Sequence, residues 1–200
     1  DIIIEHKKKK NKVIVVSSAM SGVTNDLIKK SKQISNNFID SEYDVLVSSG
    51  EQVACSLIAG RLNHKGFKSR SWLGWQIPIF TNGPYTNSRI QQVNKNKLLR
   101  FLKEGGIPVV AGFQGINMNE RVTTIGRGGS DASAIMIAKS FKAQRCIIYT
   151  DVEGVYTTDP NKLKKAKKIK VISYEEMLEM ASLGAKVMQP VSCLLYTSDA

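Results

Sequence analysis

Short apolar runs rich in β-branched residues alternate along the chain with longer stretches in which apolar residues recur every three or four positions. An uninterrupted apolar run is typical of a strand buried on both faces of a parallel sheet, and the periodic stretches are typical of helices that cover such a sheet. The clearest predicted strands are 13–16, 107–113 and 146–151, and the clearest helices begin near residues 26, 52, 96 and 131. This alternation predicts an α/β fold, a three-layer α/β/α sandwich around a mainly parallel central sheet.

Several segments are less well defined by the pattern. A helix is predicted to end within residues 1–6, and another strand is expected after residue 66. An edge strand or loop is predicted at 77–81 and a polar loop at 114–121. A short segment at 171–173 is predicted to lead into a helix at 175–180. The segment 43–47 fits either a strand or the lead-in to a buried helix, and 52–62 has the period of an amphipathic helix. Glu51 lies between these two, where a glutamate in a first helical turn would stabilise the helix dipole. The functional alternative is that Glu51 faces a ligand and accepts a hydrogen bond from an ammonium group.

A polar segment with small and hydroxyl side chains follows the apolar run 13–16 and leads into the helix near Asp26. In open α/β sheets, ligands bind at the carboxyl ends of the strands. Ser18 and Thr24 are therefore candidate ligand contacts. The alternative is that these two residues only cap the helix.

The segment 123–131 contains three glycines within four residues, directly before a predicted helix. Glycines let the backbone approach a ligand closely, and a helix N-terminus presents N–H groups and the positive end of the helix dipole. Arg127 adds a planar, permanently charged group that suits carboxylate or phosphate. The segment therefore predicts an anion-binding site.

In the predicted helix that follows, Ser130 or Asp131 would be the N-cap. The structural alternative to an anion site is a left-handed glycine turn that caps the helix. The segment matches neither the G-x-G-x-x-G fingerprint of dinucleotide folds nor the G-x-x-x-x-G-K-[ST] phosphate loop. Asp131 would be out of place in a site for anions alone. Its presence indicates a second task, the positioning of a cation or a lysine.

Composition narrows the class of protein. Of the 200 residues, 42% are hydrophobic and 23% are charged, which is ordinary for a globular protein. The net charge of +12 is concentrated in lysine-rich stretches at 7–12 and 162–170 with few interleaved aromatic residues, so no nucleic-acid partner is predicted. No apolar run approaches the roughly 20 residues of a membrane span, and no membrane partner is predicted. The three cysteines are odd in number and lack C-x-x-C spacing, which favours a reducing compartment over disulfides or zinc.

Six segments together carry a resemblance to a known family: 15–25, 49–51, 111–115, 123–131, 149–160 and 184–188. The most specific are TTIGRGGSD at 123–131 and YTDVEGVYTTDP at 149–160. Through these segments, from about residue 13 to about residue 190, the chain resembles the aspartate kinases (aspartokinases) of the amino-acid kinase superfamily.

This resemblance implies the amino-acid kinase fold and the transfer of a phosphoryl group from ATP to the side-chain carboxylate of L-aspartate, giving 4-phospho-L-aspartate. That reaction opens the route to lysine, threonine, methionine and diaminopimelate. Phosphoryl transfer depends mainly on positioning and positive charge, which agrees with the glycine segment. ATP and Mg²⁺ are implied, with Mg²⁺ held mainly by the nucleotide phosphates and by no protein metal ligand. A cytoplasmic enzyme whose parent form is a homo-oligomer is also implied.

The resemblance further implies roles for single residues. Asp131 and Arg127 would be catalytic, Asp131 by organising the centre and Arg127 by holding a carboxylate of aspartate. Glu51 would bind the ammonium group, and Phe113 would lie beside the substrate. The other implied aspartate contacts are Ser18, Thr24, Gly128, Gly129 and Ser130. The implied nucleotide contacts are Thr150, Asp151, Tyr156, Asp159, Lys162, Lys186 and Val187.

The chain also departs from the family. The family begins with a strand ending in Lys-Phe-Gly-Gly-Thr-Ser and continues into regulatory domains, and neither occurs in this sequence. We therefore expect a partial catalytic domain at 1–190, with a fold that is incomplete at both ends and inactive by itself, followed by an atypical, truncated or foreign tail at 191–200. Asn161 stands where the family usually has arginine, and Lys162 is the candidate substitute.

Two other functions stay open at this point. The first is a sister amino-acid kinase that acts on glutamate, N-acetylglutamate or UMP, because these enzymes share the sheet and an anion-binding glycine loop. The paired motifs at 49–51 and 126–131 favour aspartate over those substrates. The second is a non-catalytic regulatory subunit that binds a nucleotide or an amino acid, of which a true loss of the lysine segment would be the signature.

Overall fold

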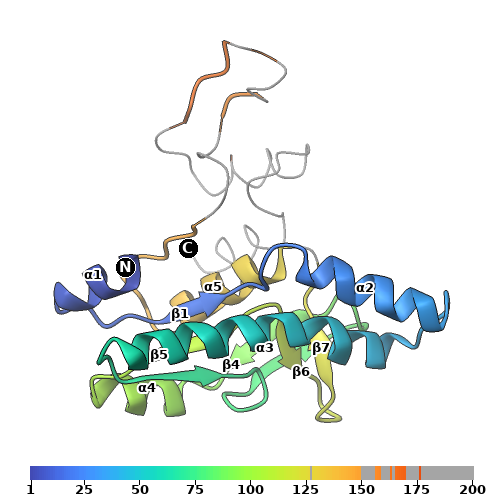
Figure 1. Ribbon diagram of the computed structural model, residues 1–200, viewed down its shortest axis with the longest axis horizontal. Coiled ribbons are helices and arrows are strands. Elements are labelled where there is room, and N and C mark those ends of the chain that lie inside the picture. Colours follow the sequence, from blue (N-terminus) through green and yellow to red (C-terminus); the bar gives the residue numbers. More distant parts are fainter. Residues whose placement is uncertain (127, 150–155, 159–162, 164, 170–175, 177–200) are drawn as a thin grey trace.

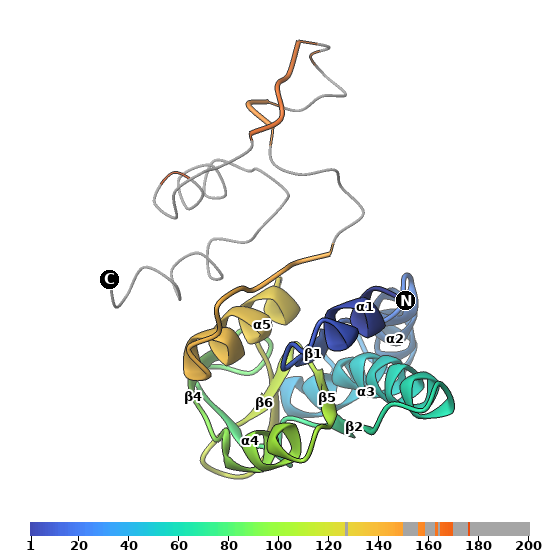
Figure 2. The same ribbon diagram turned by 90° about the vertical axis from the view of Figure 1, so that its left-hand side faces the viewer.

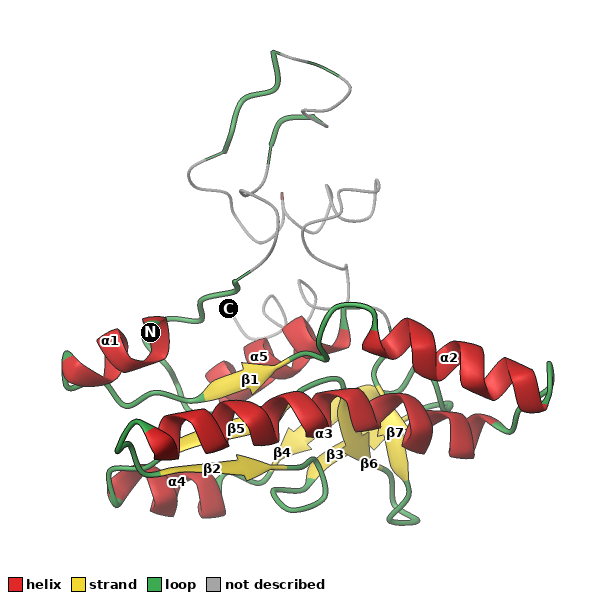
Figure 3. Cartoon of the chain, in the orientation of Figure 1, coloured by secondary structure: helices red, strands yellow, loops and turns green. Residues whose placement is uncertain are grey.

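The computed structural model describes residues 1–126, 128–149, 156–158, 163, 165–169 and 176. Its helices are α1 (Ile2–Lys8), α2 (Val23–Ile34), α3 (Asp40–His64), α4 (Asn96–Lys103) and α5 (Gly129–Ser140). Its strands are β1 (Val15–Ser17), β2 (Ser69–Trp72), β3 (Ile79–Asn82), β4 (Arg89–Val93), β5 (Ile107–Ala111), β6 (Gln114–Ile116) and β7 (Val122–Thr124). Figures 1 and 3 show the strands in the middle of the molecule, with α3 running along one side of them.

The strands form two sheets. In the first, β5 lies between β1 and β2 and is parallel to both, so that Val110 has Val16 on one side and Trp72 on the other. The second sheet has the order β4-β3-β6-β7, with β3 parallel to β6 and the other two pairs antiparallel. The predicted α/β fold with a parallel sheet is confirmed, and the second, mixed sheet is an addition that the sequence pattern did not indicate.

Helices cover the parallel sheet on both faces, as Figure 2 shows with α1, α2 and α3 on one side of the strands and α4 and α5 on the other. All five residues of β5 are buried. Val109 belongs to the core on the α3 side, and Val110 to the core that contains α4 and α5 residues. Burial of each such aliphatic side chain contributes roughly 1.5–3 kcal/mol to the stability of the fold. Because both faces of β5 are buried, its sequence is a continuous apolar run, and such a run predicts a central strand.

The segment from Asp40 to His64 is one continuous helix, α3. Of the two predictions for 43–47, the helix lead-in is confirmed and the strand is wrong. Because the helix begins at Asp40, Glu51 lies in its middle, and the predicted stabilisation of the helix dipole from a first turn is also wrong. The apolar run was ambiguous because Val47 packs into the core while Val45 is exposed, a contrast that only tertiary contacts produce.

Two further predictions are wrong in the described part of the chain. The predicted polar loop at 114–121 begins with the strand β6, whose polar residue Gln114 is fully buried and bonded within the protein. The predicted strand at 146–151 is not formed at 146–149, where Cys146 and Tyr149 are exposed and no described strand pairs with them. An apolar run forms a strand only where a neighbour supplies hydrogen bonds. The predicted helix at 175–180 lies outside the described residues except for Glu176.

Candidate functional site

The carboxyl end of β1 meets the middle of α3. The backbone N–H of Ala19 donates a hydrogen bond of 3.1 Å to Oε1 of Glu51. A Cβ atom at Gly50 would lie 2.9 Å from Cβ of Ala19, so glycine at this position lets the helix pack directly against the loop. The loop that contains the candidate Ser18 is thereby held beside the candidate Glu51.

Glu51 is buried and only partly satisfied. Its side chain is 4% exposed, and Oε2 has no hydrogen-bond partner among the described residues. Burial raises the pKa of Glu51 to about 7, and the N–H of Ala19 opposes this shift without cancelling it. A buried carboxyl group with a free oxygen is suited to accept a donor, such as an ammonium group, from a ligand.

The remaining candidates on this side lie around the same loop. Ser18 directly follows β1, and its side chain is exposed. Gly22 has a φ of 83° and directly precedes α2, and the half-buried Thr24 lies in the first turn of that helix. A Cβ atom at Gly50 would also lie 3.2 Å from Cγ1 of Val23, so the loop that contains Ser18 and the first turn of α2, which contains Thr24, both lie beside the middle of α3.

The predicted glycine segment forms a turn that leads from β7 into α5. Gly126 and Gly128 have φ values of 79° and 75°, in the left-handed region that favours glycine. The N–H of Gly129 donates to the carbonyl of Gly126, and the N–H of Ala132 donates to the carbonyl of Gly128 as the helix begins. The N–H of Gly129 is thus satisfied within the turn, and the N-terminus of α5, with the positive end of its dipole, directly adjoins the turn.

One detail of this segment corrects the sequence prediction. The residue that caps α5 is Gly128, so Ser130 and Asp131 lie inside the first turn and are not its cap. Gly128 takes this position with a φ of 75°, a left-handed backbone that glycine adopts more readily than serine or aspartate. Asp131 is half-buried, and burial raises the pKa of its carboxyl group.

The start of α5 packs against the ends of β1 and β5. The N–H of Gly112 donates to the carbonyl of Ser17, and a Cβ atom at Gly112 would lie 3.0 Å from three atoms of Ser130. Phe113, with a φ of 66°, donates its N–H to Oγ of Ser133 on α5. The helix N-terminus and the polar loop after β1 therefore lie at the same edge of the sheet.

Phe113 lies at this edge of the sheet, and its place beside a substrate stays a prediction. A Cβ atom at Gly129 would lie 2.7 Å from Cδ2 of Phe113. The aromatic ring thus packs directly on the first residue of α5. Glycine at position 129 makes this packing compatible with a helix start.

Several predicted site residues lie outside the described part of the chain: Arg127, Thr150, Asp151, Asp159, Lys162, Lys186 and Val187, with Asn161 among them. Tyr156 is described and is half-buried, and its backbone pairs locally with Lys168. The nucleotide-binding predictions therefore rest on the sequence.

Sequence reasoning missed two buried polar residues near the site. Asp44 on α3 accepts hydrogen bonds from Thr86 and Thr124, and Gln114 donates its side-chain N–H to the carbonyl of Ser48. The sequence offered one indirect signal for Asp44, since it precedes Glu51 by seven residues and therefore lies on the same face of a helix. The seven-residue spacing indicates a shared face only if both residues lie in one helix, and the sequence alone did not show that 40–64 is a single helix.

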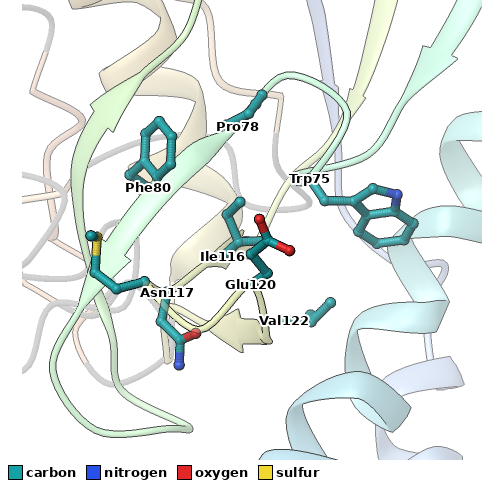
Figure 4. Close-up of a pocket in the computed structure, with 8 residues that line it drawn as sticks. Trp75, Pro78, Phe80, Ile116, Asn117, Glu120 and Val122 are labelled. Atoms are coloured by element: carbon teal, nitrogen blue, oxygen red, sulfur yellow. The ribbon is translucent and has the colours of Figure 1, made fainter.

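A pocket of about 680 Å³ lies elsewhere, between β3 and the β6–β7 connection. Figure 4 shows its apolar lining, with Trp75, Phe80 and Ile116 among the labelled side chains. None of the predicted site residues lines it. In the described residues there is no group of three or more His, Cys, Asp or Glu side chains that could hold a metal ion. None of the described helices is long and apolar enough to cross a membrane.

Comparison with known proteins places this arrangement. The model of the amino acid kinase family matches residues 1–197. The chain belongs to this family. It is 50% identical over 188 residues to an aspartokinase of Geobacillus stearothermophilus, an alignment that covers 94% of this chain and 46% of the relative. An aspartokinase of Rickettsia conorii is 49% identical over 185 residues, 91% of this chain and 46% of the relative.

Solved structures of amino acid kinases have the same fold. The structure of E. coli aspartokinase III in complex with aspartate and ADP matches with a TM-score of 0.82 and 28% identity, over 92% of this chain and 52% of that one. Aspartate kinase from Synechocystis matches with a TM-score of 0.82 and 39% identity, over 97% of this chain and 32% of that one. The predicted family and its α/β fold are thus confirmed. The chain spans less than half the length of the curated relatives it matches.

Proposed function

We propose that this chain forms part of the catalytic domain of an aspartate kinase, which transfers the γ-phosphoryl group of ATP to the side-chain carboxylate of L-aspartate. The observation that carries the proposal is the convergence of a buried, partly unsatisfied Glu51 with a glycine turn and a helix N-terminus at the carboxyl ends of β1 and β5. About 50% identity to curated aspartokinases over nearly the whole chain supports the substrate assignment.

The described residues suit the two ends of an amino acid. Glu51 in its ionised form would accept the ammonium group of aspartate through Oε2. The positive N-terminal end of α5, at Gly128, Gly129 and Ser130, would bind a carboxylate together with Arg127. Ser18, in the loop after β1, and Thr24, in the first turn of α2, would add hydroxyl groups. The substrate would thus be held by groups of both charges, which fixes its orientation.

The transfer step calls for positioning and charge compensation more than for a covalent intermediate. The side-chain carboxylate of aspartate would attack the γ-phosphorus in line with the leaving ADP oxygen. Asp131, half-buried at the start of α5, would organise the reacting groups. Mg²⁺, when bound with ATP, would neutralise phosphate oxygens, and we propose that those oxygens hold most of its coordination.

Nucleotide binding is proposed from the sequence motifs alone. The residues assigned to it are Thr150, Asp151, Tyr156, Asp159, Lys162, Lys186 and Val187. Lysines among them would compensate the charge of the phosphates. These residues follow α5 in the chain, so the amino acid and the nucleotide would be bound mainly by different segments.

A coupled ADP-release assay on the full-length protein that carries this chain tests the proposal. Mg-ATP is combined with L-aspartate, and with L-glutamate, N-acetylglutamate and UMP as alternative acceptors. Aspartate-dependent ADP release is expected, and Arg127→Ala should abolish it while the exposed Arg100→Ala on α4 should not. Activity on another acceptor alone would assign a sister kinase. ATP binding without turnover on any acceptor would favour a regulatory subunit.

A further inference from the structure

Asp44 is fully buried on α3, two helical turns before Glu51. Its carboxyl oxygens act as acceptors in the hydrogen bonds that they make with Thr86 and Thr124. The N–H of Thr86 lies 3.0 Å from both carboxyl oxygens. The N–H of Thr124 donates to Oδ2 at 2.8 Å, and the hydroxyl of Thr124 donates to Oδ1 at 2.7 Å. A carboxylate only accepts hydrogen bonds, so this ring of donors fits the ionised form.

The residues that Asp44 holds form the base of the glycine turn. Thr124 ends β7 two residues before Gly126, and its carbonyl accepts the N–H of Ser88 at 2.9 Å. A Cβ atom at Gly126 would lie 2.9 Å from Oδ1 of Asn87 and 3.3 Å from the carbonyl oxygen of Thr86. Thr86 itself has a φ of 65°, a strained backbone for a β-branched residue. Asp44 therefore holds both the end of the strand that leads into the glycine turn and the segment against which Gly126 packs.

The same face of α3 makes two more contacts toward the site. The carbonyl of Ser48 accepts the side-chain N–H of Gln114 at 3.1 Å, and Glu51 accepts the N–H of Ala19. Positions 44, 48 and 51 are four and three residues apart, so their side chains share one face of the helix. One rigid helix thus connects the base of the glycine turn to the carboxyl group that faces the loop after β1.

We propose that Asp44 is a positioning residue that sets the distance between the glycine turn and Glu51, and with it the fit of the amino-acid substrate. This inference rests on the proposed function, in which Glu51 and the start of α5 bind opposite ends of L-aspartate. Loss of the Asp44 contacts would let the turn shift relative to Glu51. The affinity for aspartate would then fall, while the nucleotide, which is assigned to later segments, would bind as before.

The test compares Asp44→Asn with Asp40→Asn in the full-length protein. Asp40 is an exposed aspartate one turn earlier on the same helix, so the two changes are chemically identical. Asparagine at position 44 places an N–H₂ group against the donors of Thr86 and Thr124. We expect the KM for aspartate to rise about tenfold in Asp44→Asn, with the KM for ATP unchanged, and no change in Asp40→Asn.

Hydrogen exchange gives a second readout that does not depend on activity. The amides of Thr86 and of residues 124–129 should exchange faster in Asp44→Asn than in Asp40→Asn. If full-length protein does not phosphorylate aspartate, the proposed function fails, and this exchange difference alone decides whether Asp44 anchors the turn. Equal exchange in the two variants would overturn the inference.

A milder variant covers the case in which Asp44→Asn does not fold. Thr124→Val removes only the hydroxyl bond to Asp44 and keeps the backbone bond, and it should raise the KM for aspartate about threefold without affecting that for ATP. A lower melting temperature with an unchanged KM for aspartate would mean that the contacts serve stability alone. That result in either variant would overturn the positioning role.

Discussion

Asp44 and Glu51 are both buried carboxyl groups on the same face of α3, yet their surroundings differ. Asp44 receives hydrogen bonds on both oxygens from the residues that support the glycine turn. Glu51 receives one from Ala19 and leaves Oε2 without a described partner. Burial raises the pKa of both groups, and in Glu51 it reaches about 7.

We interpret this difference as that between an anchor, Asp44, and the proposed binding group, Glu51. A buried carboxyl group whose oxygens are satisfied links segments of the fold at a modest net cost. One with a free oxygen leaves part of its desolvation cost uncompensated, and a ligand that brings a donor removes that cost. The contrast predicts that changes at Glu51 act mainly on ligand binding and changes at Asp44 mainly on the fold around the turn.

The substitution Glu51→Gln is expected to have the largest effect, and this effect is on catalysis. The change keeps the shape of the side chain and removes the charge that would pair with the ammonium group, so kcat/KM for aspartate should fall by about a hundredfold or more. Steady-state kinetics with both substrates varied would measure this fall. The free energy of unfolding of Glu51→Gln in the absence of aspartate should not be lower than that of the unchanged protein.

The matched control is Glu42→Gln on the same helix. Glu42 is exposed and forms an ion pair with Arg121, a surface contact that contributes about 0–1 kcal/mol. Its removal should leave kcat/KM for aspartate unchanged. A comparable loss in both variants would contradict the assignment of Glu51 to the substrate.

Next in size is the loss of stability in Asp44→Asn. Donors of Thr86 and Thr124 would face an amide group in place of a carboxylate, and unsatisfied buried donors cost about 1–3 kcal/mol. We expect the free energy of unfolding to fall by about 2 kcal/mol, measured by urea denaturation, with no change in Asp40→Asn. A Glu51→Gln protein that loses as much stability as Asp44→Asn would remove the distinction between anchor and binding group.

The sequence predicted those parts of the molecule whose structure depends on neighbouring residues in the chain. The strand β5 follows from its apolar run, and the glycine turn with the helix α5 follows from Gly126, Gly128 and the periodic residues after them. The contacts of Asp44 with Thr86 and Thr124 join residues 42 and 80 positions apart, and no local pattern reports them. The buried strand residue Gln114 was missed for the same reason.

The site shows the same division. Ser18, Thr24 and Glu51 were predicted as ligand contacts. The contacts of Ala19 with Glu51 and of Val23 with Gly50 place the segments that carry these residues side by side. The sequence placed Glu51 in a first helical turn, where its charge would be ordinary. Only its position in the middle of α3, against the loop after β1, shows that it is buried and partly unsatisfied.

A smaller effect is expected in the pH dependence of stability without ligands. The pKa of Glu51 is about 7 in the folded protein and near 4.5 in the unfolded chain, so the folded state binds more protons between these values. The contribution of Glu51 to stability is therefore fully present below about pH 4.5 and is lost as the pH rises to about 7. We expect a loss of about 2 kcal/mol over this range.

Denaturant unfolding across this range would measure the pH effect, and Glu51→Gln should remove it while Glu42→Gln keeps it. Aspartate should weaken it as well, because an ammonium group lowers the pKa of the carboxyl group it contacts. A pH profile that is the same in Glu51→Gln and in the unchanged protein would show that Glu51 does not titrate in this range. The pKa of this carboxyl group would then be no different from that of an ordinary exposed glutamate.

The smallest expected effects come from replacing two glycines of α3 by alanine. Gly50 packs against the loop after β1 beside Glu51, and Gly60 faces open space in the described part of the chain, so the pair separates the effect of this packing from that of helix propensity. A Cβ atom at Gly50 would lie 2.9 Å from Cβ of Ala19 and 3.2 Å from Cγ1 of Val23, whereas one at Gly60 would meet no atom within 4 Å. Gly60→Ala should therefore stabilise the protein by about 0.5–1 kcal/mol through helix propensity. Gly50→Ala should cost about 1 kcal/mol, because the overpacking at Ala19 outweighs the same gain. Thermal unfolding of the two variants measures the difference. Stabilisation by both would mean that the loop after β1 yields easily to α3, and Glu51 would then not be held rigidly against Ala19.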